Sequence, residues 1–179
     1  MSASLVSCST SAPPTKVTSM PVASTFGGGS GNLSTQIFNE VNSYRRSKGN
    51  SNLARHAGLD RLAQQHCEYL LKRRGQFGLY GKNVSHMGFE SRALIAREKY
   101  NMPYLSENVA STNVGGANPA AVVTRLWMNS KGHENNMVNS WDYTGVGSVK
   151  AEDGTIISTQ LFGSVGNSQF DSRSRFRMH

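Results

Sequence analysis

The stretch from Trp127 to Met137, WMNSKGHENNM, places four polar side chains that could do chemistry directly behind a predicted helix. They are His133, Glu134, Asn135 and Asn136. A neutral imidazole is a common ligand for zinc and similar ions, and a carboxylate can orient an imidazole or act as an acid or base. The pattern leaves two interpretations open: these groups either cap a turn, or face a cleft and handle a ligand.

The elements that must position these side chains follow from periodicity and capping signals. Four helices are predicted, at 34–49, with Ser34 or Thr35 as N-cap, and at 57–74, 89–100 and 118–132. Three strands are predicted, at 107–111, 143–150 and 155–162. The last two strands flank a hairpin turn that ends in Asp153-Gly154. Helices first and antiparallel strands last favour an α+β domain over a parallel sheet.

The fourth predicted helix has a clear beginning and end in the sequence. Asn118 is its predicted N-cap and Pro119 its first helical residue. An apolar stripe follows at helical spacing, formed by Val122, Val123, Leu126 and Trp127. Gly132 is predicted to end the helix and to let the chain turn at His133.

Composition limits the class of protein. The chain has 179 residues, 37% of them apolar and 17% charged, which suits one globular domain with loose ends. No apolar run is long enough for a transmembrane helix. The formal net charge is +8, but no nucleic-acid-binding motif accompanies it. We interpret the excess charge as a solvated basic surface, with at most a weak attraction to an anionic envelope or phospholipid face.

Residues 1–32 are rich in Ser, Thr, Pro, Gly and Ala, and predict a disordered tether. Within it, Leu5-Val6-Ser7-Cys8 resembles the lipobox of bacterial lipoproteins, although only seven residues precede the cysteine. Cys8 is therefore a candidate lipidation site or a chance match. Residues 33–163 form the predicted domain, and 164–179 a flexible basic tail. A disulfide with Cys67 is not expected, and Cys67 is interpreted as a small buried hydrophobe.

Five short motifs occur in a fixed order within residues 35–163. They are Asn42-Ser43-Tyr44-Arg45, preceded by Asn39; Ser85-His86-Met87-Gly88-Phe89; Ser106-Glu107-Asn108-Val109-Ala110; the stretch 127–137; and Tyr143-Thr144-Gly145-Val146-Gly147 with Thr159-Gln160-Leu161-Phe162-Gly163. Together they resemble the CAP superfamily, also called SCP-like domains, which includes cysteine-rich secretory proteins, antigen 5 and plant pathogenesis-related proteins. The compact bacterial branch is the most similar.

The resemblance implies a three-layer α-β-α sandwich with a small antiparallel sheet. It also implies a cleft where two histidines meet acidic residues. Carried over by position, the histidines are His86 and His133, and one acid is Glu107. Many eukaryotic members have a second glutamate in a Trp-x-x-Glu pattern, and this chain has Ser130 at that position.

The cleft residues admit both a functional and a structural interpretation. His86 and His133 could hold a divalent cation such as zinc, and Glu107 could orient an imidazole or act as base toward a metal-bound water. A catalytic zinc normally has three protein ligands, and only two are identified. Alternatively, each histidine bonds a nearby carbonyl or Glu107, and the carboxylate pairs with an arginine.

The resemblance implies an extracytoplasmic protein, either secreted or anchored to a bacterial envelope. The leading hypothesis is a non-enzymatic domain that binds a small apolar or lipidic ligand, or an envelope partner. The missing second acid favours binding over catalysis. The alternative is a divalent-metal-assisted hydrolase that acts on peptides or cell-envelope polymers, and a third possibility is a structural envelope protein with a vestigial cleft.

Overall fold

The computed structural model describes residues 4–11, 31–74, 76, 84–113 and 118–166. The helices in these ranges are α1 (Gly31–Ser47), α2 (Ala57–Lys72), α3 (Phe89–Tyr100), α4 (Pro119–Met128) and α5 (Lys131–Val138). The strands are β1 (Ser4–Ser11), β2 (Ala54–Arg55), β3 (Tyr104–Asn113), β4 (Tyr143–Lys150) and β5 (Thr155–Ser164).

The strands form one five-stranded sheet in the order β1-β3-β5-β4-β2. All pairings are antiparallel except that of the short β2 with β4, which is parallel. The predicted hairpin joins β4 to β5, and Gly154 takes a positive φ of 84° at its end. The main-chain N–H of Thr155 donates to the Asp153 carboxylate, which closes the turn.

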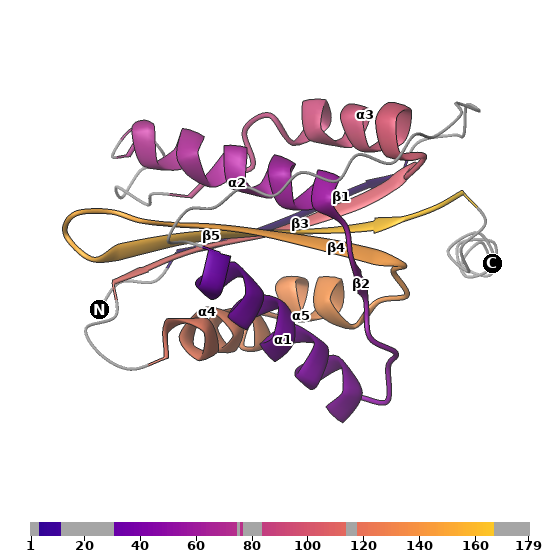
Figure 1. The fold of residues 1–179 in the computed structure, drawn as a ribbon, viewed down its shortest axis with the longest axis horizontal. Coiled ribbons are helices and arrows are strands. Elements are labelled where there is room, and N and C mark those ends of the chain that lie inside the picture. The colour runs from indigo at the N-terminus through magenta and orange to yellow at the C-terminus, as the bar shows by residue number, and fades with distance from the viewer. Residues whose placement is uncertain (1–3, 12–30, 75, 77–83, 114–117, 167–179) are drawn as a thin grey trace.

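The sheet lies between two helical layers, with α2 and α3 on one face and α1, α4 and α5 on the other (Figure 1). The predicted α+β three-layer α-β-α sandwich is therefore confirmed. Successive side chains of β3 alternate between these layers. Leu105 and Val109 pack among residues of the α2–α3 layer, whereas Ala110 packs against the layer of α1, α4 and α5.

The approach of α2 to β4 is unusually close because two glycines face the helix. A Cβ added at Gly145 or Gly147 would lie within 2.3 Å of backbone atoms of α2. The same contact is held by polar groups: the N–H of Val146 donates to Asp60, and the N–H of Ser148 donates to Gln64. This tight docking holds α2 against β4 and the neighbouring strand β5.

The structure corrects the predicted end of the fourth helix. Helix α4 already ends at Met128, with Asn129 as its C-cap, and a separate helix α5 begins at Lys131. Gly132 thus lies inside α5 rather than ending a helix, because the main-chain N–H of Glu134 bonds the Ser130 carbonyl and starts a new helical turn. The start of α4 is as predicted: the Asn118 side chain accepts from Ala121 N, and Pro119 follows it.

The structure also corrects the tether predicted for residues 1–32. Ser4–Ser11 form strand β1, which pairs with β3, and helix α1 already begins at Gly31. The composition argument missed this strand because serine and threonine are tolerated where a neighbouring strand supplies main-chain partners. Residues 1–3 and 12–30 lie outside the described residues, as do 167–179 of the predicted tail, whereas Ser164 belongs to β5.

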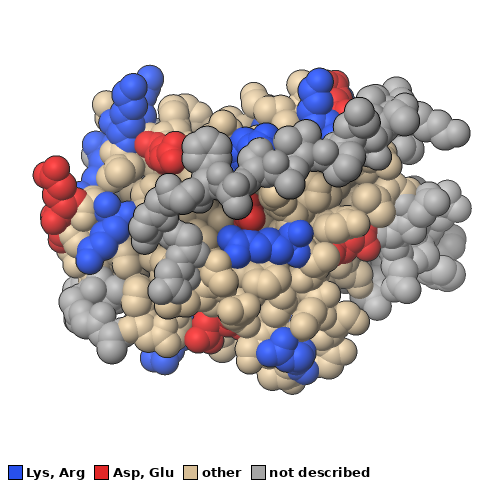
Figure 2. All heavy atoms as spheres, in the orientation of Figure 1, with Lys and Arg blue, Asp and Glu red and all other residues tan. Residues whose placement is uncertain are grey.

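On the face drawn in Figure 2, the charged side chains of the described residues are dispersed rather than gathered in one patch. Figure 2 shows Lys and Arg at several separate places on this face, with Asp and Glu between them. Part of the basic excess is paired locally, as in the Arg74–Asp153 and Arg55–Asp60 bridges. None of the described helices is long and apolar enough to cross a bilayer.

Candidate functional site

The candidate site centres on the carboxylate of Glu107, in the middle of β3. The side chain is fully buried, with 0% of its surface exposed. Because Glu107 shares the strand face of Leu105 and Val109, its carboxylate points into the layer formed by α2 and α3. A buried carboxylate needs partners that replace the water it has lost.

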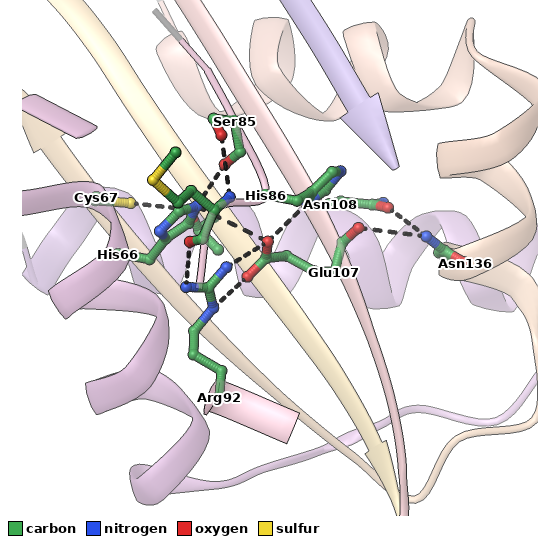
Figure 3. A network of polar contacts seen from close by, with 10 residues as sticks. His66, Cys67, Ser85, His86, Arg92, Glu107, Asn108 and Asn136 are labelled. Atoms are coloured by element: carbon green, nitrogen blue, oxygen red, sulfur yellow. Dashed lines mark hydrogen bonds and ion pairs between the residues drawn. The ribbon is translucent and has the colours of Figure 1, made fainter. Parts of the chain in front are cut away.

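Two side chains from the α3 region supply these partners (Figure 3). Arg92 of α3 donates from Nε to Oε2 at 2.7 Å and from Nη2 to Oε1 at 2.8 Å, a two-pronged ion pair. His86, just before α3, donates from Nδ1 to Oε1 at 2.7 Å. Since the third nitrogen of Arg92 bonds the Met87 carbonyl, the guanidinium also fixes the loop that carries His86.

His66 completes the cluster from α2. Its Nε2 donates to the Ser85 carbonyl at 2.7 Å and lies 3.8 Å from Glu107 Oε1. Its burial and this hydrogen bond make it a satisfied core histidine. We define His66, His86, Arg92 and Glu107 as the Glu107 cluster.

The charge states in the cluster follow from burial and from the ion pair. Burial alone would raise the pKa of Glu107, but the hydrogen bond from His86 and the charge and hydrogen bonds of Arg92 outweigh it and hold the pKa below its ordinary value. Burial lowers the pKa of His66 to about 4, although the nearby Glu107 opposes that shift. At neutral pH the cluster therefore holds an ionised Glu107 paired with Arg92, beside a neutral His66.

His133 lies in the opposite helical layer, on α5. Strand alternation directs Asn108 away from the Glu107 cluster, and Asn108 Nδ2 donates to the His133 carbonyl at 3.0 Å while its Oδ1 accepts from Asn136. The His133 ring lies with Nδ1 2.7 Å from Ser130 Oγ. The structure thus joins His86 directly to Glu107, whereas the His133 ring bonds Ser130; that His86 and His133 share one cleft beside Glu107 stays a prediction.

The other polar residues of the 127–137 stretch are structural. Asn136 bonds the Asn108 side chain, and its carbonyl accepts from Trp141 Nε1, so it fastens α5 to the sheet. Glu134 points outward, where it accepts a hydrogen bond from Tyr44 and pairs with Lys48 at 3.2 Å.

The sequence profile of the cysteine-rich secretory protein family, CAP, matches residues 38–162. The chain belongs to the CAP family. That match covers all of the Glu107 cluster and His133, but not strand β1. Among curated proteins, no relative matches the sequence.

Solved structures of bacterial CAP proteins share the fold. An outer surface protein from Borrelia burgdorferi superposes with a TM-score of 0.60 at 21% identity, over 76% of this chain and 96% of its own. A cysteine-rich secretory protein from Staphylococcus aureus gives 0.54 at 20% identity, over 76% of this chain. An extracellular protein containing a SCP domain from Bacillus anthracis gives 0.53 at 22% identity, over 74%. This chain spans only 40% of each of the last two.

A shallow groove of about 320 Å³ runs between α2 and α3, above the Glu107 cluster of this CAP domain. Its walls are largely apolar, and include Leu62, Tyr69, Met87 and Ile95. His66 and Arg92 lie at its base. The large hydrophobic residues that are exposed in the described ranges all belong to this region: Met87 at 58%, Leu94 at 44% and Ile95 at 38%.

The residues present do not fit the predicted zinc site. A structural zinc takes four protein ligands and a catalytic zinc takes three. His86 and His133 contribute one nitrogen each at most, since Nδ1 of His86 bonds Glu107 and Nδ1 of His133 bonds Ser130. Within the described residues, no group of three or more His, Cys, Asp and Glu side chains is placed to hold a metal.

Arg92 and His66 were not among the site residues predicted from the sequence, although both left a signal. Arg92 lies three residues after Phe89 and four before Ala96, and these three are the buried residues of α3. His66 interrupts the buried apolar stripe of α2 in the same way. A charged or polar residue at a core-facing helical position requires a buried partner, and Glu107 is the acid that both approach.

Proposed function

We propose that this protein is an extracytoplasmic, non-enzymatic CAP domain that binds a small apolar or lipidic ligand in the groove between α2 and α3. The observation that carries the proposal is the state of Glu107. Its carboxylate is fully buried and its oxygens are engaged by Arg92 and His86. A general base must reach the proton that it removes, so this carboxylate is built to hold the groove together rather than to act on a substrate.

The groove itself supports an apolar ligand. Met87 and Ile95 expose large apolar surfaces at its rim, and burying such a side chain against a ligand contributes about 1.5–3 kcal/mol. Its base is held rigid, because Arg92 links α3, the Met87 carbonyl and β3. A rigid apolar groove above a satisfied polar cluster favours binding without reorganisation.

The extracytoplasmic location rests on the kind of protein that shares the fold. The solved neighbours are described as an outer surface protein and an extracellular protein. The sequence also predicted a possible lipid anchor at Cys8. Processing at Cys8 is incompatible with a complete strand β1. A lipoprotein processed at Cys8 would lack Ser4–Ser7, which form half of strand β1 and pair with Asn108–Ser111. The intact mass of the mature protein decides between a lipidated Cys8 and a complete β1.

The hydrolase alternative has less support than ligand binding in this arrangement. It requires His86, His133 and Glu107 around one metal-bound water, but the Glu107 oxygens are engaged by His86 and Arg92, and the His133 ring bonds Ser130. Hydrolysis of peptides or envelope polymers that is abolished by both His86→Ala and His133→Ala would restore that alternative.

Adjacent residues on α3 provide a matched test of binding. Ile95 lines the groove, whereas Leu94 is similarly exposed but does not line it. With a fluorescent long-chain fatty acid and a dansylated phospholipid as probes, Ile95→Glu should weaken binding at least about tenfold, the loss of one buried apolar side chain. Leu94→Glu should leave the dissociation constant within about twofold. Absence of binding by the unmodified protein, or equal loss in both variants, contradicts the proposal.

A further inference from the structure

Strand β1 stands apart from the CAP domain that it completes. The family match begins at residue 38, and β1 ends at Ser11, with residues 12–30 between it and α1. Its main contacts are with β3 and, to a smaller extent, α5. Figure 1 shows β1 at the edge of the sheet, next to β3.

The contact between β1 and β3 is made through the main chain along the whole strand. The antiparallel register runs without interruption from Ser4 opposite Ser111 to Ser11 opposite Tyr104. On its other side β3 pairs with β5 over all of its ten residues. Without β1, β3 would be a long edge strand, the kind of edge that pairs with any extended segment offered to it.

We propose that the β3 edge is a strand-binding site, that residues 4–11 are its exchangeable occupant, and that two chains can trade this strand to form a swapped dimer. The contacts of β1 are the same whether it comes from its own chain or from a second copy, because antiparallel main-chain hydrogen bonds do not depend on which chain supplies the strand. Only the connection through residues 12–30 distinguishes the two arrangements.

The length of that connection sets the balance. A chain segment as long as residues 12–30 can span at most about 60 Å, which exceeds the diameter of about 40 Å expected for a domain of this size. The strand can therefore reach either β3 edge. A tether of this length gives an effective concentration on the order of 1 mM, so the unmodified chain should be a monomer at micromolar concentrations.

Shortening the connection should reverse this preference. Helix α1 packs on β4, and β1 lies three strand positions from β4, about 14 Å. A direct link from Ser11 to Gly31 spans about 3.8 Å and cannot cross that distance within one chain. Deletion of residues 12–30 should therefore convert the protein into a dimer, measured by analytical ultracentrifugation at roughly 10–100 μM, below the effective concentration of the tethered strand.

A proline control shows whether the strand makes that dimer. Adjacent residues of an edge strand alternate between facing the neighbour and facing away, so one of Leu5 and Val6 must bond β3 through its N–H. Leu5→Pro/Val6→Pro removes that donor. In the deletion background it should return the protein to a monomer. A deletion variant that stays monomeric, or a dimer that survives both prolines, overturns the proposal.

A peptide experiment avoids reliance on the deletion variant. The full chain with Leu5→Pro/Val6→Pro keeps its connection but leaves the β3 edge open. The probe is a fluorescein-labelled peptide of residues 4–11, SLVSCSTS. Its dissociation constant for the proline variant should be at least about tenfold lower than that for the unmodified chain, because the unmodified chain's own strand competes for the β3 edge. The same peptide with both prolines should not bind. Equal binding of both peptides, or no binding of either at roughly 1 mM, the effective concentration of the tethered strand, refutes the strand-binding site.

Discussion

The ion pair between Arg92 and Glu107 predicts a strong energetic coupling between α3 and the sheet. The side chain of Glu107 is fully buried and that of Arg92 is 10% exposed, so neither charge can turn to water when its partner is removed. Removing one member of a buried pair costs about 3–5 kcal/mol, because the remaining charge stays buried without compensation. Arg92→Met and Glu107→Gln should each lower the free energy of unfolding by that amount.

The double variant should be far less damaging than the sum. With both charges gone, the introduced methionine and glutamine fill volumes similar to those of the original side chains, and His86 retains an acceptor in the glutamine amide. We expect a total loss of about 4 kcal/mol against a sum of about 8 kcal/mol for the single variants, hence a coupling of about 4 kcal/mol. Urea unfolding at pH 7, followed by far-ultraviolet circular dichroism, measures all three values. Losses that add to within about 0.5 kcal/mol would refute the view that the two charges act as one unit.

Three further predictions concern residues buried between α2 and the sheet. The pKa of His66 is about 4 in the folded protein and about 6.5 in the unfolded chain, so the unfolded chain binds more protons between these pH values. The free energy of unfolding should therefore fall by about 3 kcal/mol from pH 6.5 to pH 4. In His66→Gln the fall should be smaller. Gly147→Ala, whose Cβ would meet the α2 backbone at 2.3 Å, should lower Tm by about 5–10 °C by calorimetry, whereas Gly166→Ala should not. Cys67 is buried, which raises its pKa to about 12; in a Cys8→Ser background, Ellman's reagent should label it only after unfolding.

Much of the fold was predictable because its signals are local. The N-cap of α4 at Asn118, the hairpin ending in Gly154 and the apolar stripe of α2 each depend on a few neighbouring residues. The order of helices and strands then restricted the architecture to a layered α+β domain, and the ordered motifs indicated the CAP family that the profile match shows.

Two local signals were misread because a competing interaction prevailed. Gly132 resembles a helix stop, yet the chain had already turned at Asn129 and begun α5. Residues 4–11 have the composition of a tether, yet β3 offers them an edge of unpaired main-chain groups. In both cases the deciding contact lies outside the window from which the prediction was made.

The sequence by itself determined which side chains are available for chemistry, and the pairing of His86 with Glu107 was among the arrangements it suggested. Only the tertiary structure decided their partners. Because successive residues of a strand face opposite layers, Glu107 meets Arg92 and His66 on one side of the sheet, while its neighbour Asn108 meets the α5 turn that carries His133 on the other. A one-residue step along β3 therefore directs one side chain to the cluster that contains His86 and the next to the turn that carries His133.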